Sequence, residues 1–468
     1  MRIEPSASLA RLGQAASERG AVIYNVGGAV RDRLLGFEAA DDDLAGPKQP
    51  QELARLHLPG TTVLDPVNGL GTALIHCRQG EEKEVYEYTA FRTDSYGRDG
   101  RHLPEDVCFT DDITMDARRR DFTVNALYVR LPDGEVLDPT GMGLADLKAH
   151  VLRMTRPDTL TEDALRILRL IRFAAALGFE VEPETLRAAR DQAPALRDIS
   201  WERIQAEFFR ILLGDTVYGR REAVADALYM MRDLGVLEYV LPELTEGRGF
   251  AQSPEYHCYD VLDHQIETCA AAPPELTVRL AALLHDISKP EAYRRDGNMH
   301  AHPELGSERA RQVLRRLRAP RQLISDVAEL VEHHMFDLTN EAKSKAVIRR
   351  INALGREQFE RLADLREADF AGSGRQQKAL SAEKWRKVLA GLEKDNVPLT
   401  VSGLAVSGHD LMRELHIKPG PVLGEILGQL LEHVQLRPSQ NNYKSLIKYA
   451  KMIAAGSAGA DRSASETS

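Results

Sequence analysis

Cysteine and long apolar runs are scarce in this sequence. Its four cysteines are scattered without any CxxC spacing, which argues against both a disulfide framework and a zinc ribbon. No segment reaches the roughly 18 apolar residues that a membrane-spanning helix needs, and residues 1–20 lack the apolar core of a signal peptide. We therefore expect a soluble, cytoplasmic protein with reduced thiols and no membrane partner.

A basic charge balance is also lacking. The formal net charge is −10 at pH 7, whereas a surface that binds phosphates is basic. Arginines nevertheless cluster locally, which allows a modest RNA contact on an acidic protein. The clusters lie at 118–120, within 153–172 and within 309–321. For the last cluster, a solvated helix face whose arginines pair with nearby acidic residues is an equally good interpretation.

The chain is too long for one hydrophobic core. It has 468 residues, of which 43% are hydrophobic, so several domains are expected. Short β-type runs predict an α+β domain first, and apolar residues at three- and four-residue spacing predict helices after it. The β-type runs lie at 21–26, 62–64, 74–77, 84–90 and 124–129. We predict an α+β domain over 1–150, helical regions over 151–245, 246–378 and 379–455, and a disordered tail over 456–468.

A glycine turn followed by acidic residues is the first candidate site. Residues 24–36 predict a strand, a turn and a helix, and Gly28 lets backbone N–H groups approach a phosphate. Asp41 and Asp43 follow. Because side chains two apart on a strand point to the same face, these two carboxylates should converge, while Asp42 faces the other way.

Two carboxylates on one face repel each other unless a cation lies between them. Oxygen ligands of this kind suit Mg²⁺ bound jointly with substrate phosphates, as in two-metal sites for in-line attack on an α-phosphate. Glu87, on the predicted strand 84–90, is the best candidate for a third catalytic carboxylate beside Asp41 and Asp43. The alternative for this segment is a solvent-exposed acidic turn.

Several motifs in order resemble one known family. Gly-Gly-x-Val-Arg-Asp-x-Leu-Leu-Gly over 27–36, followed by Asp-x-Asp, resembles the signature of class II tRNA nucleotidyltransferases, the family of bacterial CCA-adding enzymes and poly(A) polymerases. Segments 119–127, 138–141 and 162–166 resemble its later motifs, and a weaker resemblance covers the chain beyond 215. The resemblance implies an α+β, polymerase-β-like nucleotidyltransferase head followed by all-α domains, including an HD-type helical domain. It assigns a catalytic head to 1–150, a nucleotide- and RNA-binding neck to 151–245, an HD domain to 246–378 and a tRNA-binding region to 379–455.

The segment 162–166 contains an aspartate and an arginine at helical spacing. Asp163, Arg166 and Arg169 are spaced three apart and should share a helix face, as a plain surface ion-pair row also would. A carboxylate can accept from the exocyclic amine of cytosine or adenine while a guanidinium donates to the ring, whereas uracil and guanine present a carbonyl there. The resemblance implies that Asp163 and Arg166 select CTP and ATP, and that Arg169 and Arg172 lie near the phosphates or complete the base contact.

The resemblance also assigns residues to the sugar and the phosphates. It implies that Gly28 and Arg31 contact the triphosphate, that Arg120 contacts the nucleotide, and that Asp121 lies near the ribose 2′-OH, which would favour ribonucleotides. A local salt bridge that caps a helix is the alternative for the Arg120–Asp121 pair. The polar stretch 93–102 predicts a long loop; relatives that add only two cytidines have it shortened, which disfavours a CC-only enzyme here.

A histidine-rich region forms the second candidate site. His285 and Asp286 follow an apolar helix and resemble an HD phosphohydrolase motif, and other side chains occupy positions where that superfamily places metal ligands. Histidine with carboxylate suits Ni²⁺, Mn²⁺ or Mg²⁺ that activates water on a phosphate ester. Histidines with a structural or RNA-contacting role are the alternative. The predicted HD metal ligands are His264, His285, Asp286 and Asp369, with His302 and His334 at further matching positions.

These motifs lead to one principal hypothesis. The protein adds or repairs the 3′-terminal CCA of tRNA from CTP and ATP, using Mg²⁺ and no nucleic-acid template. A poly(A) polymerase or an A-adding enzyme is the alternative within the class, although Ala164 stands where such polymerases often carry proline. An HD-type metal-dependent phosphohydrolase, with the N-terminal half as an RNA-binding module, is the alternative of another class. The intact acidic and basic motifs of that half argue against it.

Overall fold

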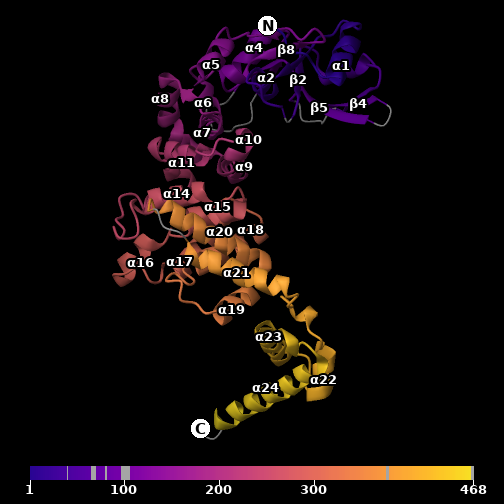
Figure 1. Cartoon of the computed structure of the whole chain (residues 1–468). Coiled ribbons are helices and arrows are strands. Elements are labelled where there is room, and N and C mark those ends of the chain that lie inside the picture. The colour runs from indigo at the N-terminus through magenta and orange to yellow at the C-terminus, as the bar shows by residue number, and fades with distance from the viewer. Residues whose placement is uncertain (40, 65–69, 80–81, 96–105, 376–378, 465–468) are drawn as a thin grey trace. The chain divides into compact units, whose positions relative to one another are not determined.

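The computed structural model describes residues 1–39, 41–64, 70–79, 82–95, 106–375 and 379–464 (Figure 1). The chain divides into two compact units. The first comprises Met1–Thr245 with Arg316–Arg318, and the second comprises Glu246–Arg315 with Ala319–Ser468. The polar loop predicted over 93–102 lies largely outside the described residues; its first residues, 93–95, belong to the strand β6, which pairs with β7.

The first unit contains a seven-stranded mixed sheet with the order β3-β4-β5-β2-β1-β8-β9. Only β2 and β5 pair in parallel, and the other neighbours are antiparallel. Alternation along β5 buries Tyr86 and Tyr88 and exposes Val85 and Glu87, as the pleat of a half-covered strand requires. The strands are β1 (Ile23–Val26), β2 (Asp43–Gly46), β3 (Thr61–Leu64), β4 (Thr72–Gln79), β5 (Glu82–Ala90), β6 (Arg92–Ser95), β7 (Asp106–Phe109), β8 (Tyr128–Leu131), β9 (Val136–Leu137), β10 (Val151–Leu152) and β11 (Glu180–Val181).

Two hydrophobic clusters lie on opposite faces of this sheet. Leu44 packs into the cluster that includes Leu9 and Leu53, whereas its neighbour Ala45 packs with Ala117 and Tyr128. Because successive strand residues point to opposite faces, α1 and α3 cover one face, and α4 covers part of the other.

The helices of the first unit follow the predicted change of pattern, with local exceptions. The region predicted as helical over 151–245 also contains the short strands β10 and β11. The strand predicted over 124–129 is instead a 3-10 turn followed by β8. The helices are α1 (Ala7–Ser17), α2 (Gly28–Leu34), α3 (Pro50–Arg55), α4 (Ile113–Arg118), η1 (Thr123–Asn125), α5 (Gly143–Ala149), α6 (Thr159–Glu162), α7 (Leu165–Leu177), α8 (Pro183–Gln192), η2 (Ala193–Asp198), α9 (Trp201–Leu212), α10 (Asp215–Tyr218), α11 (Ala223–Asp233), α12 (Leu237–Val240) and α13 (Pro242–Thr245).

The described part of the second unit is helical. Helices α14, α15, α18 and α20 pack against one another. Helices α22, α23 and α24 also contact one another, and α23 packs against α19. The elements are α14 (Val261–Ala271), α15 (Leu276–Leu284), α16 (Lys289–Asp296), α17 (His302–Arg316), α18 (Arg321–His333), α19 (Ser344–Leu354), α20 (Arg356–Gly372), α21 (Leu380–Lys394), η3 (Val401–Gly403), α22 (Gly408–Leu415), α23 (Pro421–Leu436), η4 (Pro438–Gln440) and α24 (Tyr443–Ala464). Among the described residues, no helix has the length and apolar content to cross a membrane.

The end of α24 corrects one prediction. The tail predicted as disordered over 456–468 is helical as far as Ala464, and residues 465–468 lie outside the described part. The segment 454–464 is rich in alanine, the residue with the highest helix propensity, which allows the preceding helix to continue.

Candidate active site

Acidic side chains meet at the centre of the sheet. Asp43 begins β2 and lies directly opposite Glu87 of the parallel neighbour β5, and both side chains are exposed. Although Asp43 is exposed as a residue, partial burial of its carboxyl group raises its pKa; the charges of Glu87 and, more weakly, Asp41 raise the pKa further, while Arg120 lowers it. The structure therefore brings the three predicted carboxylates near one another. Asp42 faces away, with both carboxylate oxygens paired to the Arg33 guanidinium at 2.6 and 2.8 Å.

This donor set fits a divalent cation. It offers only oxygen, which Mg²⁺ prefers, and the mutual repulsion recorded at Asp43 is what a cation relieves. In the described part of the chain, however, Asp41, Asp43 and Glu87 do not form a group whose donor atoms all lie within 4.8 Å. Their side chains would have to rotate to share one ion.

A polar pocket of about 370 Å³ opens beside Asp43. Six of its side chains are arginines, so it suits a polyanion such as a triphosphate. Gly27, at its rim, has a φ of 82°, a left-handed conformation that favours glycine at the turn from β1 into α2. The lining residues are Gly27, Gly28, Arg31, Asp43, Arg119, Arg120, Asp121, Asn125, Asp163, Leu165, Arg166, Arg169, Phe173, Arg203 and Glu207.

Asp163 lies in this pocket but not on the helix where we predicted it. It occupies an extended position between α6 and α7, so the prediction of one helix face shared with Arg166 and Arg169 is wrong for this residue. Its Oδ1 accepts a hydrogen bond from the Leu165 N–H at 3.1 Å, an arrangement that aspartate favours at helix starts. Its Oδ2 accepts from Nη2 of Arg203 at 2.6 Å.

Two predicted nucleotide ligands are largely engaged with the protein. Arg166 is 9% exposed and donates to the backbone carbonyls of Thr159 and Arg119 at 3.0 and 2.9 Å. Arg31 is 3% exposed and donates to Asn125 Oδ1 at 2.6 Å and to the Tyr218 hydroxyl at 2.7 Å. Both side chains line the pocket, but these contacts hold its walls together.

Asp121, which is buried, pairs in this pocket with the partly exposed Arg169. Nε and Nη2 of Arg169 donate to Oδ2 of Asp121 at 2.8 and 2.7 Å, and Asn125 donates to Oδ1 at 3.1 Å. Burial raises the pKa of Asp121, but Arg169 and Asn125 outweigh it and lower that pKa to about 2. Arg172 is not among the pocket-lining residues; it donates from Nε to Glu207 Oε2 at 2.8 Å.

Sequence reasoning missed two residues of α9 in this pocket. Arg203 binds Asp163, and Glu207 is 4% exposed and pairs with Arg172. Both stand four apart, on one helical face. The sequence signal that could have identified these two residues is a pair of opposite charges four apart within an otherwise amphipathic helix.

The predicted histidine cluster converges in the second unit. In each of four histidines, Nδ1 contacts a backbone carbonyl and Nε2 points to a common centre. Such a contact fixes the tautomer that leaves Nε2 as a metal ligand. The Nδ1 partners are Gly372 O for His264 at 3.2 Å, Ala282 O for His285 at 2.8 Å, Met299 O for His302 at 2.5 Å and Val331 O for His334 at 2.6 Å.

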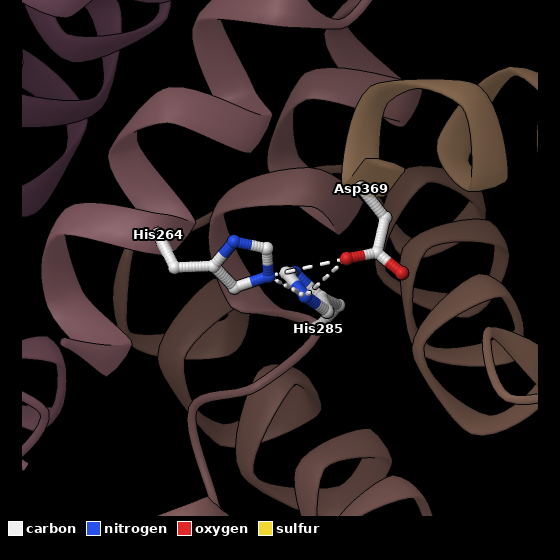
Figure 2. A group of neighbouring side chains, drawn as sticks. All are labelled: His264, His285 and Asp369. Carbon is white, nitrogen blue, oxygen red and sulfur yellow. Dashed lines mark hydrogen bonds and ion pairs between the residues drawn. The ribbon is translucent and has the colours of Figure 1, made fainter. Parts of the chain in front are cut away.

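Figure 2 shows one part of this centre, in which His264, His285 and Asp369 point toward one another. Nε2 of His264 lies 3.2 Å from Nε2 of His285 and 3.1 Å from Oδ1 of Asp369. In the other part, Nε2 of His302 lies 3.0 Å from Nε2 of His334 and 3.2 Å from Oδ1 of Asp286. The structure thus brings together the four predicted ligands and the two further matching positions, His302 and His334.

Asp286 lies between the two parts. Its Oδ2 is 3.1 Å from Nε2 of His285 and 2.6 Å from Nζ of Lys289. Within the described part of the chain, neither buried oxygen accepts a hydrogen bond of good geometry. Burial and the neighbouring histidines hold the pKa of His334 well below its ordinary value, so its imidazole is neutral. Mixed nitrogen and oxygen donors of this kind fit a transition metal. A pocket of about 370 Å³ opens at this centre.

The chain matches three family models. The model for the poly(A) polymerase head domain matches residues 23–153, the model for the probable RNA- and SrmB-binding site of polymerase A matches residues 178–247, and the model for a putative tRNA nucleotidyltransferase domain 2 matches residues 301–450. A-adding tRNA nucleotidyltransferase of Deinococcus radiodurans is 34% identical, over 87% of this chain and 90% of that protein. This chain belongs to the tRNA nucleotidyltransferase and poly(A) polymerase family.

Other members of the tRNA nucleotidyltransferase family are similarly related. A CCA-adding enzyme of Enterococcus faecalis is 30% identical over 92% of this chain and 91% of its own length. The crystal structure of the Bacillus stearothermophilus CCA-adding enzyme in complex with CTP shares the fold, with a TM-score of 0.69, 23% identity and coverage of 98% of this chain and 100% of that one. The protein is therefore a nucleotidyltransferase with a mixed-sheet head and helical domains. The three model matches leave out residues 248–300, so they do not address the HD resemblance.

Proposed function

We propose that this nucleotidyltransferase adds or repairs the 3′-terminal CCA of tRNA, using CTP, ATP and Mg²⁺ without a nucleic-acid template. The observation that carries the proposal is the placement of Asp43 opposite Glu87, beside an arginine-rich pocket that also holds Asp163. Relatives named CCA-adding enzymes support the choice of product.

Different residues of the first unit have different roles in the proposed reaction. Asp41, Asp43 and Glu87 would hold the divalent cations, which when bound neutralise charge on the phosphates and lower the pKa of the attacking 3′-hydroxyl. The pocket arginines hold the triphosphate, with Gly28 allowing close approach of the backbone.

Base choice rests on Asp163 and its arginine partners. Its carboxylate accepts from the exocyclic amine of cytosine or adenine, and a guanidinium of Arg203 or Arg166 donates to the neighbouring ring acceptor. The pair between Asp163 and Arg203 shows that the carboxylate and a donor fork already stand side by side in the pocket. Uracil and guanine would place a carbonyl against the carboxylate.

An A-adding enzyme is the second candidate within this class, because the Deinococcus radiodurans relative carries that name. The test uses purified protein, tRNAs that end before CCA or after CC, and each nucleotide alone or together. CCA addition requires C, C and A on the shorter tRNA and termination after three nucleotides. A addition only to the CC-ended tRNA favours the A-adding enzyme, and a long A tail favours a poly(A) polymerase.

We further propose that the second unit holds an HD-type phosphohydrolase centre with Ni²⁺, Mn²⁺ or Mg²⁺. The convergence of four imidazoles with Asp286 and Asp369 supports it. The finer division follows the motifs: head 1–150, neck 151–245, HD domain 246–378 and tRNA-binding region 379–455, in a cytoplasmic protein. The test measures metal-dependent release of phosphate from phosphomonoesters and metal-dependent ring opening of cyclic phosphodiesters to phosphomonoesters; His285→Ala should abolish both without affecting nucleotide addition.

A further inference from the structure

One face of the seven-stranded sheet is covered over β1, β2 and β8 but open over the neighbouring strands. Ala45 and Tyr128 are buried on this face in the cluster that includes α4. On the same face, in the described part of the chain, Leu64, Leu74 and Val85 are 49%, 41% and 52% exposed. We call these three side chains the apolar platform. Three neighbouring exposed aliphatic side chains indicate a binding surface more than isolated ones do.

The platform begins at the catalytic carboxylates. Across the strands, Asp43 pairs with Glu87, Glu87 with Leu74, and Leu74 with Leu64, so the four residues form one row on one face. Val85 precedes Glu87 by two residues on β5 and therefore shares that face. The row passes directly from negative charge to apolar surface.

Positive charge lies farther along the same face. Arg78 and Lys83 are directly opposite each other on β4 and β5, and both are exposed. A hollow of about 410 Å³ lies here; its lining includes Leu64, His76, Arg78 and Lys83. Among the described residues, the buried Nε2 of His76 has no hydrogen-bond partner.

Nucleotidyl transfer needs two substrates on opposite sides of one phosphorus atom. The attacking oxygen and the leaving diphosphate lie in line. The nucleotide pocket is built from Gly28, after β1, and from Arg120 and Asp121, before β8, so it lies on the β1 side of Asp43. An acceptor 3′-hydroxyl on the other side of Asp43 would approach over β5, where the platform lies.

We propose that the 3′-terminal nucleoside of the acceptor RNA packs on the apolar platform, and that Arg78 and Lys83 contact the phosphates that precede it. The proposal rests on the proposed nucleotidyl transfer to RNA. Contact between an apolar surface and a base or ribose tolerates any nucleoside, and this suits an acceptor end whose identity changes with each addition. The basic pair supplies the charge complementarity that an RNA backbone requires.

The principal test compares Leu74→Asp with Met142→Asp, a change at a residue of similar exposure, 42%, in the turn before α5. Leu74→Asp should raise the KM for acceptor RNA about tenfold or more, because it removes apolar contact and repels phosphate. The KM values of Leu74→Asp for ATP and CTP should stay within about twofold of the wild-type values. All kinetic constants of Met142→Asp should stay within the same range. Leu74→Met, which keeps an apolar side chain at this position, should have the wild-type KM for RNA.

Two further measurements do not depend on turnover. Lys83→Ala should weaken RNA binding and reduce the slope of log Kd against log salt by about one. An acceptor RNA with a photoreactive 3′-terminal 4-thiouridine should crosslink to the peptides that carry Leu74 or Val85.

The outcomes separate the two proposals. If the wild-type protein extends RNA but Leu74→Asp keeps the wild-type KM for RNA, or matches the Met142 control, the platform proposal fails alone. A rise confined to the KM for nucleotides, or a crosslink elsewhere, overturns it too. If the wild-type protein extends no RNA, the proposed function fails and this inference falls with it.

Discussion

Arg169 donates two hydrogen bonds, at 2.8 and 2.7 Å, to one carboxylate oxygen of Asp121, 48 residues earlier in the chain. The pair joins α7 to the segment before η1, and thus ties the helical part of the first unit to the sheet.

Arg169→Ala would leave a buried carboxylate without its charge partner. We expect a loss of about 2–3 kcal/mol in the free energy of unfolding at pH 7, below the range for a fully buried pair because Arg169 is 33% exposed. Urea unfolding would measure it. Arg130→Ala, which breaks an exposed pair with Asp133, should cost under about 1 kcal/mol.

The same pair has a pH signature. The folded pKa of Asp121 is lowered to about 2 from an ordinary 3.8, so its contribution is fully present above the ordinary value and is lost as the pH falls through about 2. The difference in Tm between wild type and Arg169→Ala should therefore shrink as the pH is lowered from about 4 toward about 2. A difference that grows in this window would contradict the assignment.

Asp43 and Glu87 should be needed for chemistry and not for folding. Asp43→Asn or Glu87→Gln should lower kcat by about a thousandfold, roughly 4 kcal/mol of barrier, with Tm unchanged, because both residues are exposed and are the proposed cation ligands. Asp42→Asn is the matched control, since Asp42 pairs with Arg33; it should affect Tm more than kcat. Single-turnover rates and melting curves measure both. Equal rates for Asp42→Asn and Asp43→Asn would count against the carboxylate assignment.

Metal binding at Asp43 should weaken at a higher pH than at an ordinary aspartate. Burial and the charge of Glu87 raise the pKa of Asp43. As the pH falls, protons therefore begin to compete with the cation for this carboxylate at a higher pH than they would at an aspartate of ordinary pKa. Mn²⁺ affinity, followed by electron paramagnetic resonance, should fall as the pH drops through this raised value. Glu87→Gln should move the midpoint to lower pH even if it weakens binding overall; an upward shift would contradict the stated cause.

Asp163 and Arg203 should control which base is accepted. Asp163→Ala should reduce the preference for CTP and ATP over UTP and GTP by about 1–3 kcal/mol in kcat/KM. Arg203→Ala should have a smaller effect in the same direction, because it removes the partner that orients Asp163. Steady-state kinetics with the four nucleotides measure both. Arg210→Ala, an exposed change on the same helix, should leave the ratios unchanged.

The histidine cluster should bind metal independently of nucleotide addition. Purified protein should retain a transition metal detectable by elemental analysis, and His264→Ala or Asp286→Ala should lower the bound amount. Their rates of CCA addition should equal the wild-type rate after correction for stability. His300→Ala serves as a control, because His300 is exposed and lies just before His302 in the chain. Unchanged metal content in the cluster variants would show that the histidines have a structural role.

Local patterns predicted much of this protein. Alternation along a strand indicated that Asp42 faces away from Asp43, and Asp42 is indeed paired with Arg33. The three- and four-residue spacing of apolar residues predicted helices after residue 150, and in α7 this spacing places the buried Leu168 and Ile171 on the core side. These features depend on the backbone period, which neighbouring residues set. The error at Asp163 has the same origin: continuing a helical period through it ignored the preference of aspartate for bonding to N–H groups at a helix start.

By itself, the sequence determined the order of motifs, the change from strands to helices and the residue types available for phosphate chemistry. Only the tertiary structure decided which of them meet. The register of β2 against β5 places Asp43 opposite Glu87, packing of α9 brings Arg203 to Asp163, and separate elements of the helical unit carry the histidines to one centre. Such contacts join residues tens of positions apart. They depend on which faces bury apolar surface together, and no local period encodes that choice.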